Sequence, residues 1–296
     1  MNQRQKADLM LILVALSWGF SYYFVDLAMM ELGSFTLNAY RFFVAFGIAF
    51  LFSFPQLKSP NKTTLLHSLG CGFLLFLVYI GANMGVKYTT LSNTGFLASM
   101  TVIFTPIFAF LYYRRVPKPH TFLSVILCFI GICLLTLGDG FTINMKNFKG
   151  DIASILCAIC YANHLLFTEY AVKKKTVDAY QLSVYQFFVC GLLNVIAAFI
   201  WESPILPSSG KIWAATLFLS VFCTGMAFVV QAIAQKFTTA TRVGIIFSLE
   251  PVFAGIVAFI FAGERLGLRA YIGAFLMVTS IFIMELAPII WKKRRV

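Results

Sequence analysis

Residues 231–269, QAIAQKFTTATRVGIIFSLEPVFAGIVAFIFAGERLGLR, decide how the rest of this 296-residue chain is interpreted. They form an apolar run of helix length that is interrupted near its middle by Glu250 and Pro251. A carboxylate at the centre of a membrane helix costs about 2.5–3.5 kcal/mol on insertion scales, and a proline frees the carbonyl one turn earlier. Lipid does not satisfy that carbonyl, so we expect the interruption to face protein or a water-filled cavity.

Two interpretations of Glu250 stay open. An acid within the membrane beside a helix break is a functional site by default, and Gly244, Ser248 and Gly255 on the same run allow another helix to approach closely. Alternatively, Glu250 is a neutral, hydrogen-bonded packing residue. The functional interpretation is favoured: Glu250 takes up and releases a proton as its hydration changes, and Pro251 forms a break that takes part in gating.

The composition indicates a membrane protein. The chain is 60% hydrophobic and 11% charged, whereas a soluble domain carries about 25% charged residues. The net charge is +12, but the basic residues lie between apolar runs and form no continuous face, which argues against nucleic acid. All seven cysteines lie inside apolar runs, so we expect no disulfide framework. Cys157 and Cys160 have the spacing of a redox pair, but no thioredoxin-like strand pattern surrounds them.

Ten apolar runs are long enough to span a bilayer. The fold class predicted from them is an all-α polytopic membrane protein with ten transmembrane helices in two inverted five-helix repeats. The first repeat is expected over residues 1–138, a connecting loop over 139–150, and the second repeat with a basic cytoplasmic tail over 151–296. The runs cover residues 8–29, 35–55, 66–87, 91–113, 120–138, 151–172, 178–201, 212–235, 239–262 and 267–290.

The Lys and Arg residues between the runs predict the orientation. If the N-terminus is cytoplasmic, most of them, including those at 173–175 and 292–295, fall on the cytoplasmic side. This is the distribution that the positive-inside rule describes. We therefore expect both termini to be cytoplasmic. The N-terminal run is longer than that of a signal peptide and no small-residue cleavage site follows it, so it is interpreted as a retained first span.

The two halves of the chain repeat each other. Residues 40–44 (YRFFV) match 185–189 (YQFFV), and 87–90 (KYTT) match 236–239 (KFTT). Five helices are an odd number, so the halves must enter the membrane from opposite sides, as in many secondary transporters with a site near the midplane. Pro106 and Pro251 lie about one turn apart when the repeats are aligned, and each is expected to interrupt its helix near mid-membrane.

At this point the chain resembles the drug/metabolite transporter superfamily, specifically the ten-helix EamA-type permeases with two EamA repeats. The resemblance covers essentially the whole chain. It implies a polytopic permease of the cytoplasmic membrane, many of whose relatives export amino acids or other small metabolites. It also implies a central cavity lined by the first, third, fourth, sixth, eighth and ninth helices. The motifs that carry it are 16–19 (LSWG), 40–42 (YRF), 104–106 (FTP), 249–254 (LEPVFA), 263–266 (GERL) and 272–276 (IGAFL).

The chain departs from the symmetric pattern in places that weaken any assignment of the substrate. Residues 114–117 (RRVP) stand where the second repeat has GERL, and Gln186 stands opposite Arg41. Tyr161-Ala162 replaces the tryptophan that is common in the sixth helix of the family.

Polar and aromatic side chains inside the spans supply the candidate site. For each, a structural role stays open: packing for the aromatic residues, helix bridging for the amides, a backbone-bonded neutral ring for the histidine, and headgroup contact for Arg41. The predicted solute-binding residues, expected around one midplane chamber, are Trp18, Tyr22, Tyr79, Asn83, His164 and Gln231. The predicted coupling or gating residues are Arg41, Glu250, Pro106 and Pro251.

The function expected is that of a secondary transporter. It would move a small organic solute, such as an amino acid or related metabolite, by alternating access, with export favoured over import. A lipid-scrambling or structural membrane protein is the alternative. A membrane-embedded enzyme is less favoured, because no His-Glu-x-x-His pair and no paired intramembrane aspartates occur. No nucleotide-binding loop and no set of metal ligands is present, so no cofactor or metal is expected. The expected partners are the solute and the lipid bilayer, without nucleic acid, in a monomer or homodimer.

Overall fold

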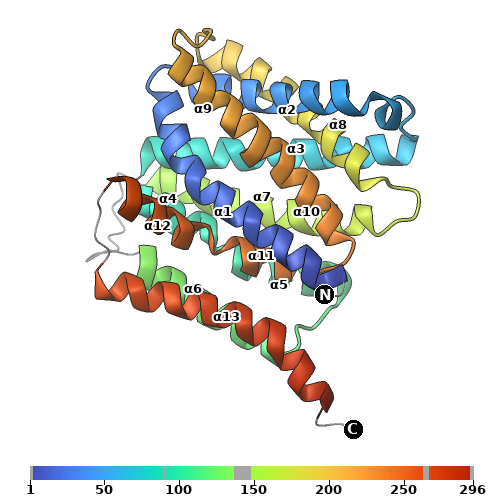
Figure 1. The fold of residues 1–296 in the computed structure, drawn as a ribbon, viewed down its shortest axis with the longest axis vertical. Helices are drawn as coiled ribbons and strands as arrows, with labels where there is room; N and C mark the ends of the chain where they lie inside the picture. Colours follow the sequence, from blue (N-terminus) through green and yellow to red (C-terminus); the bar gives the residue numbers. More distant parts are fainter. Residues whose placement is uncertain (1–2, 90, 137–147, 263–266, 294–296) are drawn as a thin grey trace. The chain divides into compact units, whose positions relative to one another are not determined.

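The computed structural model describes residues 3–89, 91–136, 148–262 and 267–293, and every regular element in these ranges is helical (Figure 1). Most of the predicted 139–150 loop, the 263–266 motif and the last three residues of the basic tail lie outside the described residues. The helices are α1 (Gln3–Met29), α2 (Ser34–Leu57), α3 (Lys62–Tyr88), α4 (Leu91–Ser99), α5 (Thr101–Tyr113), α6 (Pro119–Thr136), α7 (Phe148–Val172), α8 (Ala179–Trp201), α9 (Gly210–Ser220), the π-helix η1 (Val221–Met226), α10 (Ala227–Gln235), α11 (Ala240–Phe247), α12 (Glu250–Ala262) and α13 (Leu268–Lys293).

All ten predicted runs are helical, which confirms an all-α polytopic membrane fold. Eight helical segments are long and apolar enough to cross a membrane, and two more, 119–135 and 268–284, are apolar and shorter within the described residues. Several boundaries have a local cause. The side chains of Asp178, Ser209 and Thr239 accept backbone N–H groups at the starts of α8, α9 and α11, as helix-capping residues do. Helix α5 ends at Arg114, which adopts the left-handed conformation with φ 54°.

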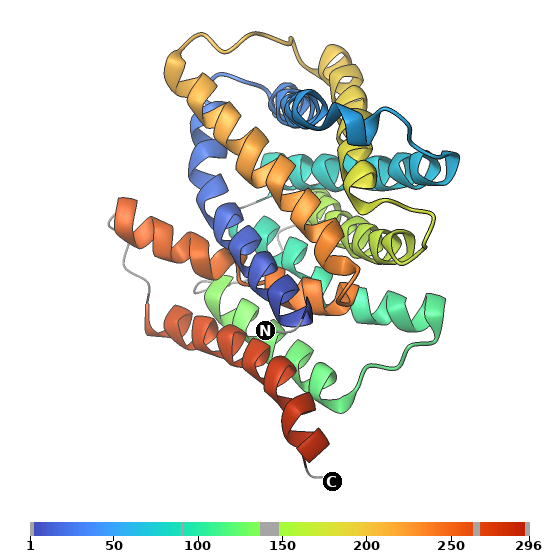
Figure 2. The ribbon, with the colours of Figure 1, turned by 45° about the vertical axis from the view of Figure 1, so that its right-hand side comes forward.

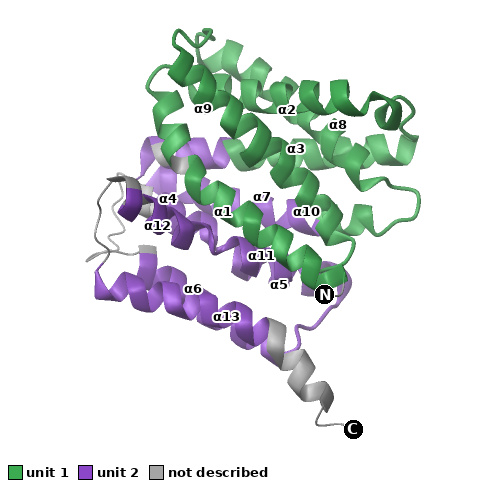
Figure 3. Ribbon diagram, viewed as in Figure 1, with its two compact units in different colours: residues 1–79, 167–238 green, residues 80–166, 239–296 purple. Residues whose placement is uncertain are grey.

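The helices form two compact units that cut across the two halves of the sequence (Figure 3). Unit 1 comprises residues 1–79 and 167–238, and unit 2 comprises residues 80–166 and 239–296. Each unit therefore combines segments from both sequence repeats. The boundary between the units falls inside α3 and inside α7, so neither predicted repeat corresponds to one compact unit.

Unit 1 is organised by close packing of α2 on α8. A Cβ atom on Gly191 of α8 would lie 3.2 Å from the Phe43 ring and 3.3 Å from Phe42 Cβ. Helix α3 also approaches α8 closely, because a Cβ atom on Gly72 would lie 2.9 Å from the carbonyl oxygen of Gln186. Because the two glycines have no side chain, the neighbouring helices pack directly against the glycine backbone, as they do at small residues between membrane helices.

Unit 2 is organised by the pairing of α6 with α13, which run side by side in Figures 1 and 2. Their backbones meet at two glycines: a Cβ atom on Gly131 would lie 2.7 Å from the Gly273 oxygen, and one on Gly273 would lie 2.6 Å from the Gly131 oxygen. The end of α3 packs on α7 in a similar way, where a Cβ atom on Gly81 would lie 2.8 Å from the Ala153 oxygen. Helix α11 packs on α5.

Two of the spans in unit 2 are interrupted at equivalent positions. Met100 separates α4 from α5, and Ser248 and Leu249 separate α11 from α12. When Lys87 is aligned with Lys236, Met100 falls opposite Leu249. The interruption predicted beside Glu250 is present, and its counterpart in the first half lies at the same place in the repeat.

The prediction for Pro106 was wrong. Helix α5 runs without a break from Thr101 to Tyr113, with Pro106 inside it, and the interruption lies at Met100. Near Pro106, the Thr105 hydroxyl donates to the carbonyl oxygen of Thr101 at 2.7 Å. Pro106 frees the carbonyl of Val102, four residues earlier, and a membrane helix tolerates an internal proline where neighbouring helices and small local adjustments satisfy the freed group.

Candidate functional site

The interruptions in unit 2 are stabilised by hydroxyl groups. At the α4–α5 interruption, the Thr101 hydroxyl lies 2.8 Å from the carbonyl oxygen of Ala98 and 3.3 Å from that of Ala158 on α7. At the α11–α12 interruption, the Ser248 hydroxyl donates to the carbonyl oxygen of Ile245 at 2.6 Å. Carbonyls that lose their helical N–H partners need other donors at membrane depth, and these side chains supply them.

Glu250 and Pro251 begin α12 rather than occupying its interior. Glu250 is the first residue of the helix and is half-buried. Proline is favoured in the first turn, because the N–H that it lacks would have no helical partner there. Glu250 interacts electrostatically with Cys157 of α7. The sequence thus places a carboxylate at a helix N-terminus, where the helix dipole favours negative charge.

His164 and Asn83 also belong to unit 2. His164 is fully buried on α7, and its ring stacks on that of Tyr161 with 5.9 Å between the ring centroids. Asn83 is half-buried near the end of α3, and its Nδ2 atom has no hydrogen-bond partner in the described part of the chain. Gly244 of α11 faces α5, since a Cβ atom there would lie 3.6 Å from the Thr105 hydroxyl oxygen.

Arg41 is the centre of a second cluster, which lies within unit 1. Its side chain, on α2, is 6% exposed. The Nε group donates to the hydroxyl oxygen of Thr224 in η1 at 3.2 Å, and the guanidinium carbon lies 5.4 Å from the centroid of the Tyr79 ring on α3. A guanidinium near an aromatic face is attracted by the ring quadrupole. Three helices therefore hold this cation in one orientation.

Further aromatic side chains pack beside the Tyr79 ring that contacts this cation. Phe42 contacts the Tyr79 ring edge-on at 5.2 Å between centroids and also approaches Phe228 at 6.4 Å. Trp18 of α1 packs on Phe228 at 5.8 Å, and its Nε1 group donates to the carbonyl oxygen of Cys223 in η1 at 2.9 Å. We call Trp18, Arg41, Phe42, Tyr79, Thr224 and Phe228 the Arg41 cluster.

Comparison with known families decides what kind of protein carries these sites. Residues 5–137 and 148–286 each match the EamA-like transporter family. The chain belongs to the EamA-like transporter family. The resemblance inferred from the sequence motifs is thereby confirmed, including the presence of two repeats.

Relatives and a solved structure agree with this assignment. An uncharacterized transporter of Archaeoglobus fulgidus is 30% identical to this EamA-like transporter over 285 residues, which cover 96% of this chain and 87% of the relative. The uncharacterized transporter YoaV of Bacillus subtilis is 20% identical over 94% of this chain and 96% of its own length. A protein crystal structure superposes with a TM-score of 0.83 at 16% identity, covering 96% of this chain and 97% of that one; it supports the fold alone.

The structure of this EamA-like transporter distributes the predicted site residues over both units. Trp18, Arg41 and Tyr79 come together in the Arg41 cluster of unit 1. Gln231 lies in the same unit, is almost fully buried, and its Nε2 atom bonds the Oε1 atom of Gln235 at 3.2 Å. Unit 2 contains Asn83, Pro106, His164, Glu250 and Pro251. The side chain of Tyr22 lies outside the described residues. A single chamber lined by residues of both units stays a prediction.

Sequence reasoning missed the residues that hold these sites in place. Thr224 escaped notice because the whole stretch 212–235 has the composition of one regular helix, and a π-helix has no strong sequence signal. Its only hints are the polar Thr224 and the adjacent Gly225 in an apolar run. Thr101 and Ser248 were also missed as donors. Aligning the repeats on Lys87 and Lys236 could have found Thr101, because it falls opposite Glu250.

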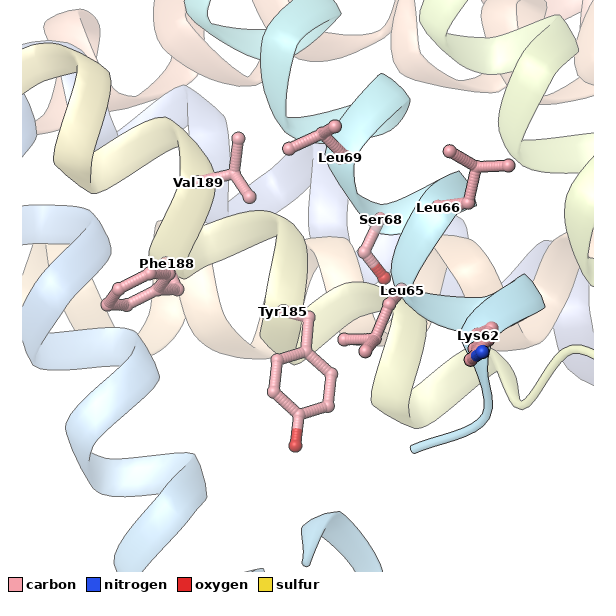
Figure 4. Close-up of a pocket in the computed structure, with 8 residues that line it drawn as sticks. All are labelled: Lys62, Leu65, Leu66, Ser68, Leu69, Tyr185, Phe188 and Val189. Carbon is pink, nitrogen blue, oxygen red and sulfur yellow. The ribbon is translucent and has the colours of Figure 1, made fainter. Parts of the chain in front are cut away.

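An apolar groove of about 400 Å³ in unit 1 lies apart from these residues (Figure 4). It runs between α3 and α8, with Lys62 at one end and the side chains of Leu65, Tyr185 and Phe188 along it. None of the predicted solute-binding residues lines it. Of its polar lining groups, the hydroxyls of Ser68 and Tyr185 already donate to backbone carbonyls, which leaves Lys62 to orient a polar solute. The Arg41 cluster and the interruptions in unit 2 therefore remain the candidate sites.

Proposed function

We propose that this EamA-like transporter is a secondary transporter that moves a small organic solute, such as an amino acid or related metabolite, across the cytoplasmic membrane by alternating access. Export is the favoured direction. The single observation that carries the proposal is the pair of matched interruptions in unit 2. Broken helices at equivalent positions of two repeats are how many secondary transporters bring backbone dipoles and polar side chains to a solute.

The contacts at the interruptions support this proposal. Helix α5 begins at Thr101 and α12 begins at Glu250, so each repeat presents a helix N-terminus within unit 2. The hydroxyls of Thr101 and Ser248 satisfy nearby carbonyls, which keeps the breaks stable at membrane depth. A passive membrane scaffold does not require paired breaks of this kind.

Orientation is part of the proposal and has a direct test. We propose that both termini are cytoplasmic, that the 139–150 loop is external, and that the repeats are inverted. Single cysteines introduced at Met1, at Val296 and in the loop, on a background without the seven native cysteines, are labelled with an impermeant maleimide in intact cells. Labelling only of the loop is expected. Loop and Val296 on the same side would exclude five spans in the second repeat and thus the inverted arrangement.

Glu250 is proposed to couple transport to a proton gradient. In proteoliposomes, the wild-type protein should move radiolabelled substrate from a panel of amino acids and analogues faster when a pH gradient is imposed. Glu250→Gln preserves the shape and hydrogen bonding of the side chain but does not titrate. It should fold, lose pH-driven transport and retain exchange of solute. Asp26→Asn is the control, since it removes a carboxylate from an exposed position of α1.

Two outcomes would count against this role of Glu250. Unchanged pH dependence in a well-expressed Glu250→Gln protein would end the coupling hypothesis. If Glu250→Ala fails to fold while Glu250→Gln behaves as wild type, Glu250 is a structural residue at the start of α12.

Absence of any transport by the wild-type protein across the whole panel, with or without a gradient, would instead contradict the transport proposal itself.

A further inference from the structure

Arg41 places a full positive charge among neutral groups. The side chain is 6% exposed, and an isolated buried charge is strongly unfavourable unless it is paired. Within the part of the chain that the structure describes, it contacts the Thr224 hydroxyl and the Tyr79 ring and interacts electrostatically with the Cys190 thiol, none of which is a carboxylate. No carboxylate of the described residues lies within ion-pair distance of it. Among the described residues, the fold therefore supplies no carboxylate to balance this cation.

The guanidinium is oriented so that most of its donors stay available. It carries five N–H groups, and within the described residues only the one on Nε makes a hydrogen bond, to Thr224. Neither terminal nitrogen is both fully buried and without a hydrogen-bond partner. They are therefore not sealed among apolar atoms. Because Thr224 fixes one edge of the planar group, the edge formed by the two terminal nitrogens is held ready for a ligand.

The local backbone supports a binding role for this arrangement. Thr224 lies in the π-helix η1, and π-helical turns inside α-helices are often found at functional sites. The same turn presents the Cys223 carbonyl to Trp18. One irregular turn therefore fixes both the cation and an aromatic neighbour. Because the side chain is largely buried, the lower local dielectric strengthens the attraction between the guanidinium and an anion.

We propose that Arg41 binds a single carboxylate of the transported solute, held by two parallel N–H···O bonds from its terminal nitrogens. This inference rests on the proposed transport function and adds the substrate class, a monocarboxylate. The single positive charge of Arg41 favours a solute with one negative charge rather than two, because the Arg41 cluster contains no second cation. The planar fork of arginine matches a carboxylate in bidentate geometry. Thr224 and Tyr79 are positioning residues.

The test measures binding without transport. The purified full-length protein is placed in nanodiscs of phosphatidylcholine alone, and its thermal midpoint is recorded against increasing benzoate and against benzamide, the neutral analogue of similar shape. Benzoate should raise the Tm in a saturable manner and benzamide should not. Arg41→Gln should weaken benzoate binding about tenfold or more. Arg41→Lys should weaken it by less, because lysine keeps the charge but loses the bidentate fork.

Two further variants protect the test against misfolding and nonspecific charge effects. Lys62→Gln removes the same charge from an exposed position at the start of α3 and should leave benzoate binding unchanged. If Arg41→Gln does not fold, Thr224→Val serves instead: it keeps the guanidinium but removes the acceptor of its Nε group. It should weaken benzoate binding about two- to tenfold.

The outcomes that overturn the inference are specific. Equal responses to benzoate and benzamide, or undiminished benzoate binding in Arg41→Gln, exclude a carboxylate site at Arg41. If phosphatidylglycerol in the nanodiscs blocks benzoate competitively, the ligand of Arg41 is a lipid headgroup and the solute proposal is wrong. Transport of neutral or cationic solutes that is unaffected by Arg41→Gln would defeat this inference alone. Benzoate binding that depends on Arg41, in a protein that transports nothing, would defeat the proposed function alone.

Discussion

The π-helix η1 in unit 1 and the break between α11 and α12 in unit 2 interrupt their spans in different ways. At η1 the chain remains helical through Ala227, and side chains from other helices serve the irregular turn: Trp18 of α1 bonds a carbonyl, and Arg41 of α2 bonds a hydroxyl. At the α11–α12 break the helix ends, and the hydroxyl of the nearby Ser248 satisfies a carbonyl three residues earlier and lies 2.8 Å from the Cys128 sulfur of α6.

The difference concerns which parts of the protein depend on each other. An interruption served by distant helices ties those helices together, so a change at η1 is felt by α1 and α2. At the α11–α12 break, Ser248 serves its own turn and contacts one other helix, α6, so fewer helices depend on this break than on η1. The α4–α5 interruption is similar, because Thr101 contacts both its own turn and α7.

The largest effect on stability is expected at η1. Trp18→Phe keeps an aromatic ring but removes the donor to the Cys223 carbonyl, and interhelical hydrogen bonds in membranes contribute up to about 1.7 kcal/mol. The free energy of unfolding in mixed micelles should fall by about this amount. Trp213→Phe, at a side chain that is 37% exposed, is the control and should change it much less. Equal losses in both variants would mean that η1 does not depend on α1.

A smaller effect is expected at the α4–α5 interruption. Thr101→Val keeps the shape of the side chain and removes a donor to the carbonyls of Ala98 and Ala158, so stability should fall by about 0.6–1 kcal/mol. Thr279→Val is the matched control, because its exposed hydroxyl bonds only the Phe275 carbonyl of its own helix. A Thr101→Val protein as stable as this control would show that the contact to α7 contributes nothing.

The smallest effect is expected from the proline at the α11–α12 break. Pro251→Ala adds an N–H in the first turn of α12, where no helical acceptor is required, so the stability change should stay within about 0.5 kcal/mol. Thermal unfolding of this variant beside Ser248→Ala compares the two residues directly. A larger loss for Pro251→Ala than for Ser248→Ala would mean that the proline, rather than the hydroxyl, maintains the break.

Much of the fold follows from the sequence. Long apolar runs bounded by Gly, Pro and basic residues give ten helical segments, since a membrane leaves the backbone few alternatives. The break beside Glu250 was also predictable, because Glu-Pro within an apolar run has an evident physical penalty. The position of the first break was not predictable: Pro106 has a similar penalty, but α5 continues through it, and Met100 carries no signal of its own.

The candidate site was predictable only in part. Trp18, Arg41 and Tyr79 stood out as polar or aromatic groups within spans, and they lie together in unit 1. The π-helix η1, which bonds both Trp18 and Arg41, depends on tertiary contacts that cannot be predicted from a local sequence pattern. The predicted boundary at residues 139–150 follows the repeats in the sequence, whereas the compact units follow packing between helices that are distant in the chain.

Each unit combines chain segments that are far apart in the sequence, and this has a consequence for how the protein is synthesised and assembled. Unit 1 needs residues 167–238 and unit 2 needs residues 239–296, so neither unit can be completed while only the first half has left the ribosome. Helices α2 and α6 are inserted long before α8 and α13, against which they pack. During this interval, Thr224 has not yet been synthesised to accept the hydrogen bond from Arg41, and Gly273 is not yet present to pack against Gly131 of α6. The last segment of unit 1 ends at residue 238 and that of unit 2 at residue 296, so the chain of unit 1 is complete before that of unit 2.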